Sequence, residues 1–136
     1  MIAEEFDIET PRAYLKKLKD NIIYLKYKTD MNLELKDAVL VNNEIFKLAD
    51  GQFYAVLIDG KGVYGNITNE ARLHYANDPK TKDIRLAEAI VLDNLPARMF
   101  AHFYMRVNKP KNPVKIFKTN QAALEWIYTV YKNHQK

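Results

Sequence analysis

The sequence predicts a mixed α/β fold whose sheet begins with an antiparallel hairpin and continues with mostly parallel strands, in the element order ββαβαβαβα. Stretches rich in β-branched and aromatic residues are separated by stretches in which apolar residues recur three and four positions apart. Strands that alternate with helices in this way favour parallel pairing through helical crossovers. The 136 residues match the usual size of one domain, so we expect a single domain, 1–136, with its core at about 13–132.

The first half of the chain contains signals for a hairpin, a long helix and a central strand. Weak alternation over 13–18 and period-two apolar residues over 22–27, separated by a turn signal at 19–21, predict the hairpin. The segment 33–49 has apolar residues at spacings of three and four, which predicts one helix. The apolar run 54–58 has turn residues on both sides, as in a strand covered on both faces, so we expect it in the middle of the sheet.

The second half alternates helices and strands after a glycine-rich segment. Three of the four glycines fall within 60–65, where the backbone needs conformational freedom. Thr68 has the side chain of a helix N-cap, Pro96 suits the first turn of a helix, and the two prolines of 108–113 predict a rigid loop. The predicted elements are a helix from Thr68 to about Asn77, a strand over 86–92, a helix from Pro96 to about Val107, a strand over 114–117 and a helix from Gln121 to about Lys132.

The composition excludes several classes of site. The chain contains neither cysteine nor serine, which excludes disulfides, thiolate metal sites, thiol nucleophiles and serine hydrolases. Its apolar runs are far shorter than the roughly 20 residues that span a bilayer. Glu4, Glu5 and Asp7 make the first residues acidic where a secretion signal is basic. We therefore expect a cytoplasmic protein without a membrane span.

The net charge of +4 is unevenly distributed along the chain. Residues 1–95 contain 13 Lys and Arg against 16 Asp and Glu, a net charge of −3, whereas residues 96–136 contain 8 against 1, a net charge of +7. Such asymmetry favours a surface for phosphates, anionic lipid head groups or an acidic partner. The alternative is a solvated basic face that balances the acidic part of the same domain.

Four short motifs carry a resemblance to a known family. They are the strand and turn Val56-Leu57-Ile58-Asp59-Gly60, the aromatic-rich helix 96–107, the turn Asn108-Lys109-Pro110 and the closing Ala123-Leu124-Glu125-Trp126-Ile127. With the order of the elements, they make residues 13–132 resemble a family of small bacterial STAS-like proteins of unknown function, similar in fold to the SpoIIAA-like anti-sigma-factor antagonists. The resemblance implies a SpoIIAA-like fold, a single STAS-like domain, and a role in protein interaction or ligand sensing.

The chain departs from STAS antagonists at the loop after the central strand. In those proteins the loop carries a phosphorylatable serine or threonine, whereas here the matching segment is Asp59-Gly60-Lys61-Gly62, without a hydroxyl group. The phosphorylation switch of the family is therefore not expected at this loop. Thr68 lies downstream, where a phosphate at a helix N-terminus is favourable, but an ordinary capping role is the simpler interpretation.

Asp59, Lys61 and Thr68 are the candidate ligand-binding residues. Asp59 follows a central strand, and open α/β sheets usually bind ligands at the carboxyl ends of their strands. The alternative for Asp59 is a structural role in which it accepts hydrogen bonds from loop amides. Together with the basic last third of the chain, these residues suggest a site for a small ligand or a lipid head group.

Nucleotide, metal and cofactor sites are not predicted. The glycines of 60–65 superficially match a dinucleotide fingerprint, but the last of them precedes the Thr68 cap instead of lying in the opening turn of the helix. The three histidines, His74, His102 and His134, are far apart and have no second ligand at a helical spacing that favours a metal.

The predicted helix 96–107 is apolar on more than one side, which favours a contact surface. A stripe facing the core is expected from Leu95, Met99, Phe103 and Val107. The remaining aromatic residues and the basic residues around them form the candidate interaction surface, Arg98, Phe100, Tyr104, Arg106, Lys109 and Lys111. The alternative is a helix fully buried in a small core.

The function that the sequence favours is a non-catalytic interaction or regulatory module, STAS-like and homodimeric. Its expected partners are a second copy or an unidentified protein, and no specific nucleic acid is expected because no RNA-binding fingerprint is present. The alternative is a domain that binds a small ligand or lipid head group through the loop after the central strand and the basic C-terminal third. No catalytic residues, metal or cofactor are predicted.

Overall fold

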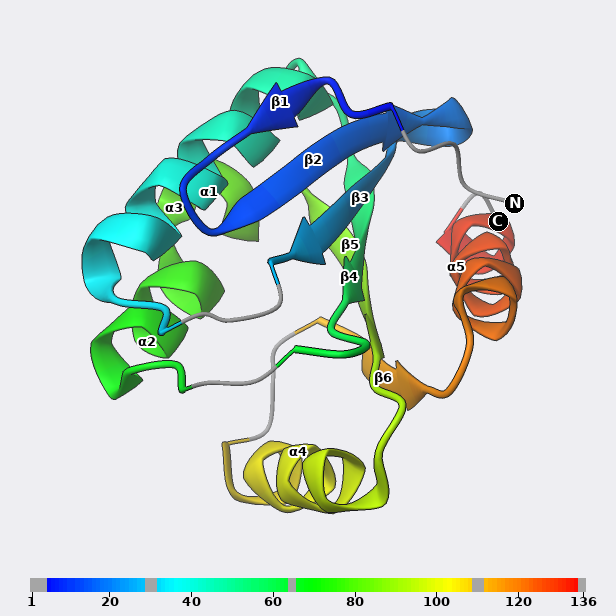
Figure 1. Ribbon diagram of the computed structural model, residues 1–136. Coiled ribbons are helices and arrows are strands. Elements are labelled where there is room, and N and C mark those ends of the chain that lie inside the picture. Colours follow the sequence, from blue (N-terminus) through cyan, green and yellow to red (C-terminus); the bar gives the residue numbers. More distant parts are fainter. Residues whose placement is uncertain (1–4, 29–31, 64–65, 109–111, 135–136) are drawn as a thin grey trace.

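The computed structural model describes residues 5–28, 32–63, 66–108 and 112–134, except for the side chains of 100 and 103–108 (Figure 1). Within these residues it has one six-stranded sheet with the strands in sequence order. The strands are β1 (Ile8–Glu9), β2 (Ala13–Leu18), β3 (Ile22–Tyr27), β4 (Tyr54–Asp59), β5 (Arg85–Val91) and β6 (Val114–Phe117). β1, β2 and β3 pair antiparallel, and β3 to β6 pair parallel. The predicted mixed sheet with an antiparallel start is therefore confirmed.

The hairpin turns at the predicted residues. Between β2 and β3, the short 3-10 helix η1 (Lys19–Asn21) contains Asp20 at φ 63° and Asn21 at φ 56°. Both types of side chain tolerate this left-handed conformation. The Asn21 side-chain amide also donates to the carbonyl oxygens of Ala49 and Phe53, which ties the turn to the segment before β4. The two-residue β1 was not predicted because it is too short to show a period.

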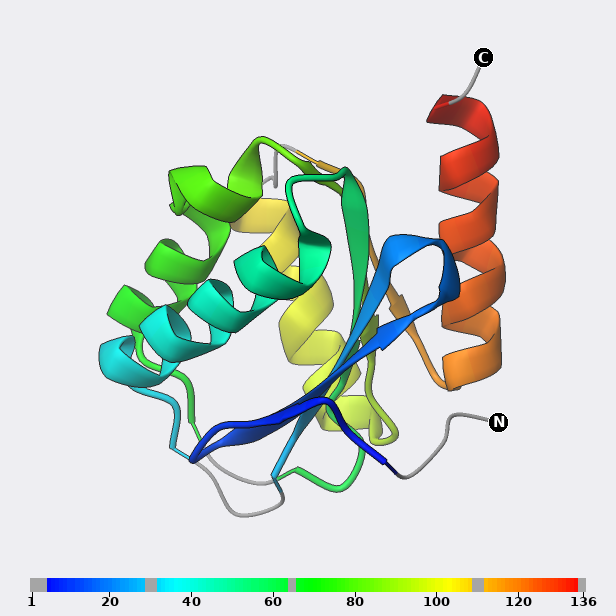
Figure 2. The same cartoon turned by 90° about the horizontal axis from the view of Figure 1, so that it is seen from above.

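Helices cover both faces of the sheet (Figures 1 and 2). They are α1 (Leu35–Ala49), α2 (Asn69–Asn77), α3 (Pro79–Lys82), α4 (Leu95–Asn108) and α5 (Asn120–His134). α1, α2 and α3 lie on one side and α5 on the other. The single-turn α3 is an addition to the predicted order, and Asp78 starts it by accepting a hydrogen bond from the Lys80 amide. The predicted N-cap Thr68 accepts from the Ala71 amide.

The core has two layers separated by the sheet. On the α1 side, Val41 and Ile45 pack against Val56 of β4. On the α5 side, Ala123 and Ile127 pack against Ala55 and Leu57 of the same strand. All six residues of β4 are buried, which confirms that it is a central strand covered on both faces. β4 ends at the glycine-rich loop, where a side chain on Gly60 would meet Leu92, and Gly62 has a left-handed φ of 71°.

α4 is placed differently from the other helices. It lies on the α1 and α2 side of the sheet in Figure 2, but beyond the ends of the strands in Figure 1. Leu95 and Met99 are 60% and 63% exposed, whereas Ala97, Arg98 and Ala101 are half-buried. The prediction that Leu95 and Met99 face the core is therefore wrong. Their spacing places them on one face, but that face points outward because α4 turns its alanine side toward the protein.

None of the helices in the described ranges has the length and apolar character needed to cross a membrane.

Candidate functional site

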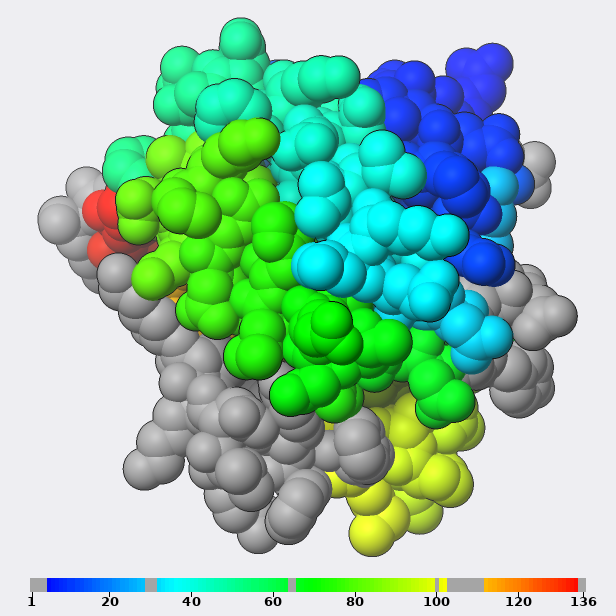
Figure 3. Space-filling view, turned by 90° about the vertical axis from the view of Figure 1, so that its left-hand side faces the viewer, coloured from blue at the N-terminus to red at the C-terminus, as the bar shows by residue number. Residues whose placement is uncertain are grey.

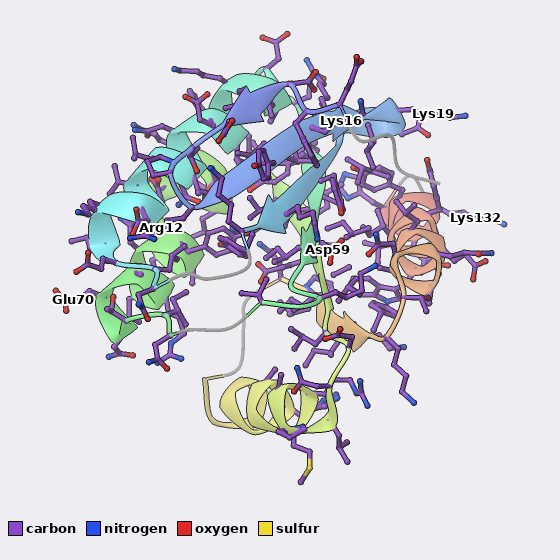
Figure 4. The ribbon with its side chains drawn as sticks, viewed as in Figure 1. Arg12, Lys16, Lys19, Asp59, Glu70 and Lys132 are labelled. Carbon is purple, nitrogen blue, oxygen red and sulfur yellow. The ribbon has the colours of Figure 1, made fainter. Side chains whose placement is uncertain are left out.

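Asp59 is the centre of a polar cluster at the carboxyl end of β4 (Figure 4). The parallel register places it opposite Lys26 of β3. Its Oδ2 atom accepts hydrogen bonds from the Tyr24 hydroxyl at 2.5 Å and from the Asn120 side-chain amide at 3.3 Å. Its Oδ1 atom accepts from the Lys61 backbone amide at 3.1 Å. One carboxylate thus joins β3, the glycine-rich loop and the start of α5.

The surroundings keep Asp59 ionised. Burial acts to raise its pKa, but the hydrogen bonds from Tyr24 and the Lys61 amide, with the charges of Lys26 and Lys61, outweigh burial and leave the pKa below its ordinary value. Burial and the neighbouring carboxylate raise the pKa of Tyr24 far above its ordinary range. Tyr24 therefore remains a hydrogen-bond donor, and Asp59 remains an anion.

Asp59 itself is closed to a ligand, because only 2% of the residue is exposed and both of its oxygens accept from this chain. The accessible groups are the ammonium ends of Lys26 and Lys61. Each lies 3.8 Å from Asp59 Oδ2, and the two side chains are 38% and 35% exposed. Across the described ranges, no group of three or more potential metal-ligating side chains is found. The groups of this cluster that a ligand can reach are therefore two ammonium cations, which lie next to the buried Asp59 carboxylate.

The candidate residues from the sequence fall in different places. Asp59 and Lys61 are brought together, whereas Thr68 is the N-cap of α2 and has no described contact with either. Arg98 donates to the Leu92 carbonyl at 3.2 Å and so anchors the start of α4. The side chains of Phe100, Tyr104 and Arg106, and all of Lys109 and Lys111, lie outside the described residues.

Sequence reasoning missed Tyr24, Lys26 and Asn120. Lys26 stands near the end of a predicted strand, as Asp59 does, and comparing the ends of parallel strands could have paired the two. Tyr24 and Asn120 gave no such signal, because a tyrosine in a strand and an asparagine at a helix start both have common structural roles.

A second polar cluster lies under α2 and was also missed. Arg85 is 6% exposed, and its guanidinium donates to the carbonyls of Tyr75 and Ala76 at 3.3 and 3.2 Å. It also lies 4.0 Å from the Glu88 carboxylate, whose side chain is 15% exposed. Burial raises the pKa of Glu88, and Arg85 only partly offsets this effect. Glu88 is therefore an acid held largely away from solvent, beside a buried base.

An apolar groove of about 770 Å³ lies between the first half of α1 and the start of α2, where cyan meets green in Figure 3. Leu35 and Leu40 in its lining are 43% and 44% exposed, so the groove is open to a partner. Its lining residues are Glu34, Leu35, Lys36, Val39, Leu40, Thr68 and Glu70.

Comparisons with known proteins agree with this fold. The chain superposes with a TM-score of 0.57 on the crystal structure of an uncharacterized protein from the DUF3478 family with a SpoIIAA-like fold, from Shewanella loihica PV-4. The identity is 15%, and the match covers 84% of this chain and 90% of that chain. The fold is thus SpoIIAA-like, as the resemblance predicted. No curated protein matches the chain. The model of the domain of unknown function DUF7793 matches residues 16–131, and the chain therefore belongs to that family.

Proposed function

We propose that this chain is a non-catalytic interaction module that pairs with a second copy of itself through α4. The observation that supports this best is the outward face of α4. Leu95 and Met99 are four residues apart, so they lie on one side of the helix, and they are the two most exposed large apolar residues among those described. Burying a side chain of this size stabilises a complex by about 1.5–3 kcal/mol.

The non-catalytic part of the proposal is supported by Asp59. The carboxyl ends of parallel strands are where α/β enzymes usually hold their reacting groups. In this chain the acid at that place already accepts hydrogen bonds from Tyr24, Asn120 and Lys61, and its pKa is lowered. Asp59 therefore serves as a fixed anion that orders the loop and α5, in keeping with a scaffold for binding.

We expect Met99→Glu to weaken self-association about a hundredfold, because a symmetric dimer loses the contact twice, at roughly 1.5 kcal/mol each. Sedimentation equilibrium and native mass spectrometry measure the change directly. Phe46→Glu is the matched control, because Phe46 is 42% exposed on α1 and far from α4 in the chain. A wild-type chain that stays monomeric, or a Met99→Glu variant that dimerises like the wild type, contradicts the proposal.

The second candidate function is the binding of a phosphate-bearing small ligand or lipid head group at Lys26 and Lys61. Two half-exposed ammonium groups at the carboxyl edge of the sheet favour it. Titration with inorganic phosphate, followed by amide chemical shifts, is expected to perturb the glycine-rich loop. Lys61→Gln should remove most of this response, and Lys47→Gln, whose side chain is 70% exposed on α1, should not. A response that is equal in both variants excludes this site.

A further inference from the structure

We propose that a pocket of about 430 Å³ beside the last turns of α5 binds a small organic ammonium cation. The pocket lies at the amino ends of β4 and β5, because its lining includes Phe53, just before β4, and Leu86, the second residue of β5. It is therefore at the opposite end of the sheet from Asp59. A pocket of this size is at the lower end of the range for small-molecule sites.

Three parts of the chain that are far apart in sequence form the pocket. The turn between β2 and β3 contributes Asp20, and α5 contributes Tyr128 and Tyr131. The turn lies beside α5 in both Figure 1 and Figure 2. The third part is β5, where a register shift leaves Leu86 without a partner in β4. Such a bulge redirects a side chain, and here Leu86 supplies an apolar wall of the pocket.

Hydrogen bonds hold these parts together before a ligand is bound. The Tyr131 hydroxyl donates to the backbone carbonyl of Asn21 at 3.1 Å, which joins α5 to the turn. The Asn21 side-chain amide donates to the Phe53 carbonyl at 3.0 Å, which joins the turn to the segment before β4. The pocket is therefore preorganised, and a ligand does not have to assemble it.

Aromatic rings form much of the lining. The rings of Tyr128 and Tyr131 lie at 90° with their centroids 6.4 Å apart, and those of Phe53 and His134 lie at 64° and 5.2 Å. Rings at such angles form corners instead of flat stacks. Phe53 and Tyr128 are 53% and 42% exposed, so a ligand can reach them. The face of an aromatic ring attracts cations, and sets of such rings recognise quaternary ammonium groups.

Asp20 provides the charge that favours a cation over an anion. It is exposed, and among the described residues no basic side chain forms an ion pair with it. Partial burial, and then the neighbouring Asp20 carboxylate, raise the pKa of Tyr128, so the acid lies close to the ring. Lys132 also lines the pocket, but its side chain extends away from the protein in Figure 4. An ammonium group in the pocket would thus meet both a carboxylate and aromatic rings.

The test is a titration with choline chloride at constant ionic strength, followed by amide chemical shifts. We expect saturable shifts at Phe53, Leu86 and Tyr128. The uncharged alcohol of the same shape, in which a carbon atom replaces the ammonium nitrogen, should bind at least about tenfold more weakly, because the rings and the carboxylate attract the charge. If the two compounds bind equally well, or if choline causes no saturable shift at these residues, the proposal is wrong.

Asp20→Asn tests the role of the carboxylate. Asparagine tolerates the left-handed backbone of this position, so the turn is expected to keep its shape. The variant should bind choline about fivefold more weakly. Asp50→Asn is the matched control, because Asp50 is also exposed and left-handed, at φ 55°, but does not line the pocket. Equal losses in both variants would contradict a site at Asp20, and circular dichroism checks that both variants fold.

Discussion

Asp59→Ala is expected to lower the free energy of unfolding by about 3 kcal/mol near neutral pH, because it leaves hydrogen-bond donors in the interior without an acceptor. The substitution leaves the Tyr24 hydroxyl and the Asn120 amide without their acceptor, and Tyr24 is only 4% exposed. It also frees the loop amide of Lys61. Unfolding by urea, followed by circular dichroism, measures the loss.

Lys26→Ala and Lys61→Ala are the controls for Asp59→Ala. Both ammonium groups are more than one-third exposed and 3.8 Å from the carboxylate, so solvent screens their attraction. Each replacement should cost less than about 1 kcal/mol. If the lysine variants lose as much stability as Asp59→Ala, the attraction of the charges holds the cluster and the hydrogen bonds do not.

The pKa of Asp59 adds a pH dependence to this expectation. Because the folded-state pKa lies below the ordinary value of 3.8, the carboxylate stabilises the fold above that value. This contribution disappears as the pH falls through the folded-state pKa. The stability difference between the wild type and Asp59→Ala should therefore shrink in acid and be full near neutral pH.

The order of the main elements was predictable because it depends on local patterns. Hydrophobic period, turn residues and caps placed the hairpin, β4 and the cap Thr68 correctly. The partners of Asp59 were not predictable in the same way. Tyr24 and Asn120 are 35 and 61 residues away from it in the chain, and they meet it only through the parallel register and the return of α5 across the sheet.

α4 illustrates a different limit. The spacing of Leu95 and Met99 correctly places them on one side of a helix, but periodicity does not say which side faces the protein. That choice depends on where the connection from β5 places the helix. Arg98 contributes to it by donating to the Leu92 carbonyl just after β5. The exposed face of α4 thus became visible only in the structure.

The ion pair of Arg85 and Glu88 depends on a β-bulge that the sequence does not reveal. Residues three apart on a regular strand point to opposite faces. Here Tyr54 pairs with Arg85 and Ala55 with Ala87, so Leu86 is an extra residue that brings Arg85 and Glu88 to the same face. An acid in the middle of an otherwise apolar strand is the one signal that was available.

Arg85→Met is expected to lower the free energy of unfolding by about 3–4 kcal/mol, because it leaves the Glu88 carboxylate in its buried site without a counter-charge. It also removes the donors to the Tyr75 and Ala76 carbonyls near the end of α2 and the guanidinium that lies 5.0 Å from the Tyr75 ring. Methionine keeps most of the apolar volume, so the loss reports on polar interactions. Urea unfolding of the variant and the wild type measures it.

The double variant Arg85→Met/Glu88→Met distinguishes two causes of the lost stability, the uncompensated Glu88 charge and the lost hydrogen bonds of Arg85. Removing the carboxylate should recover part of the stability, since an apolar pair of similar size often replaces a buried ion pair at little cost.

The pKa of Glu88 is raised above its ordinary value of 4.5, so its ionisation opposes folding as the pH rises from that value through the folded-state pKa. Without Arg85 to offset burial, this penalty should grow. The deficit of Arg85→Met should therefore be smallest in acid and largest near neutral pH, while the double variant lacks this trend. If the two variants respond to pH alike, Glu88 does not carry the charge that Arg85 compensates.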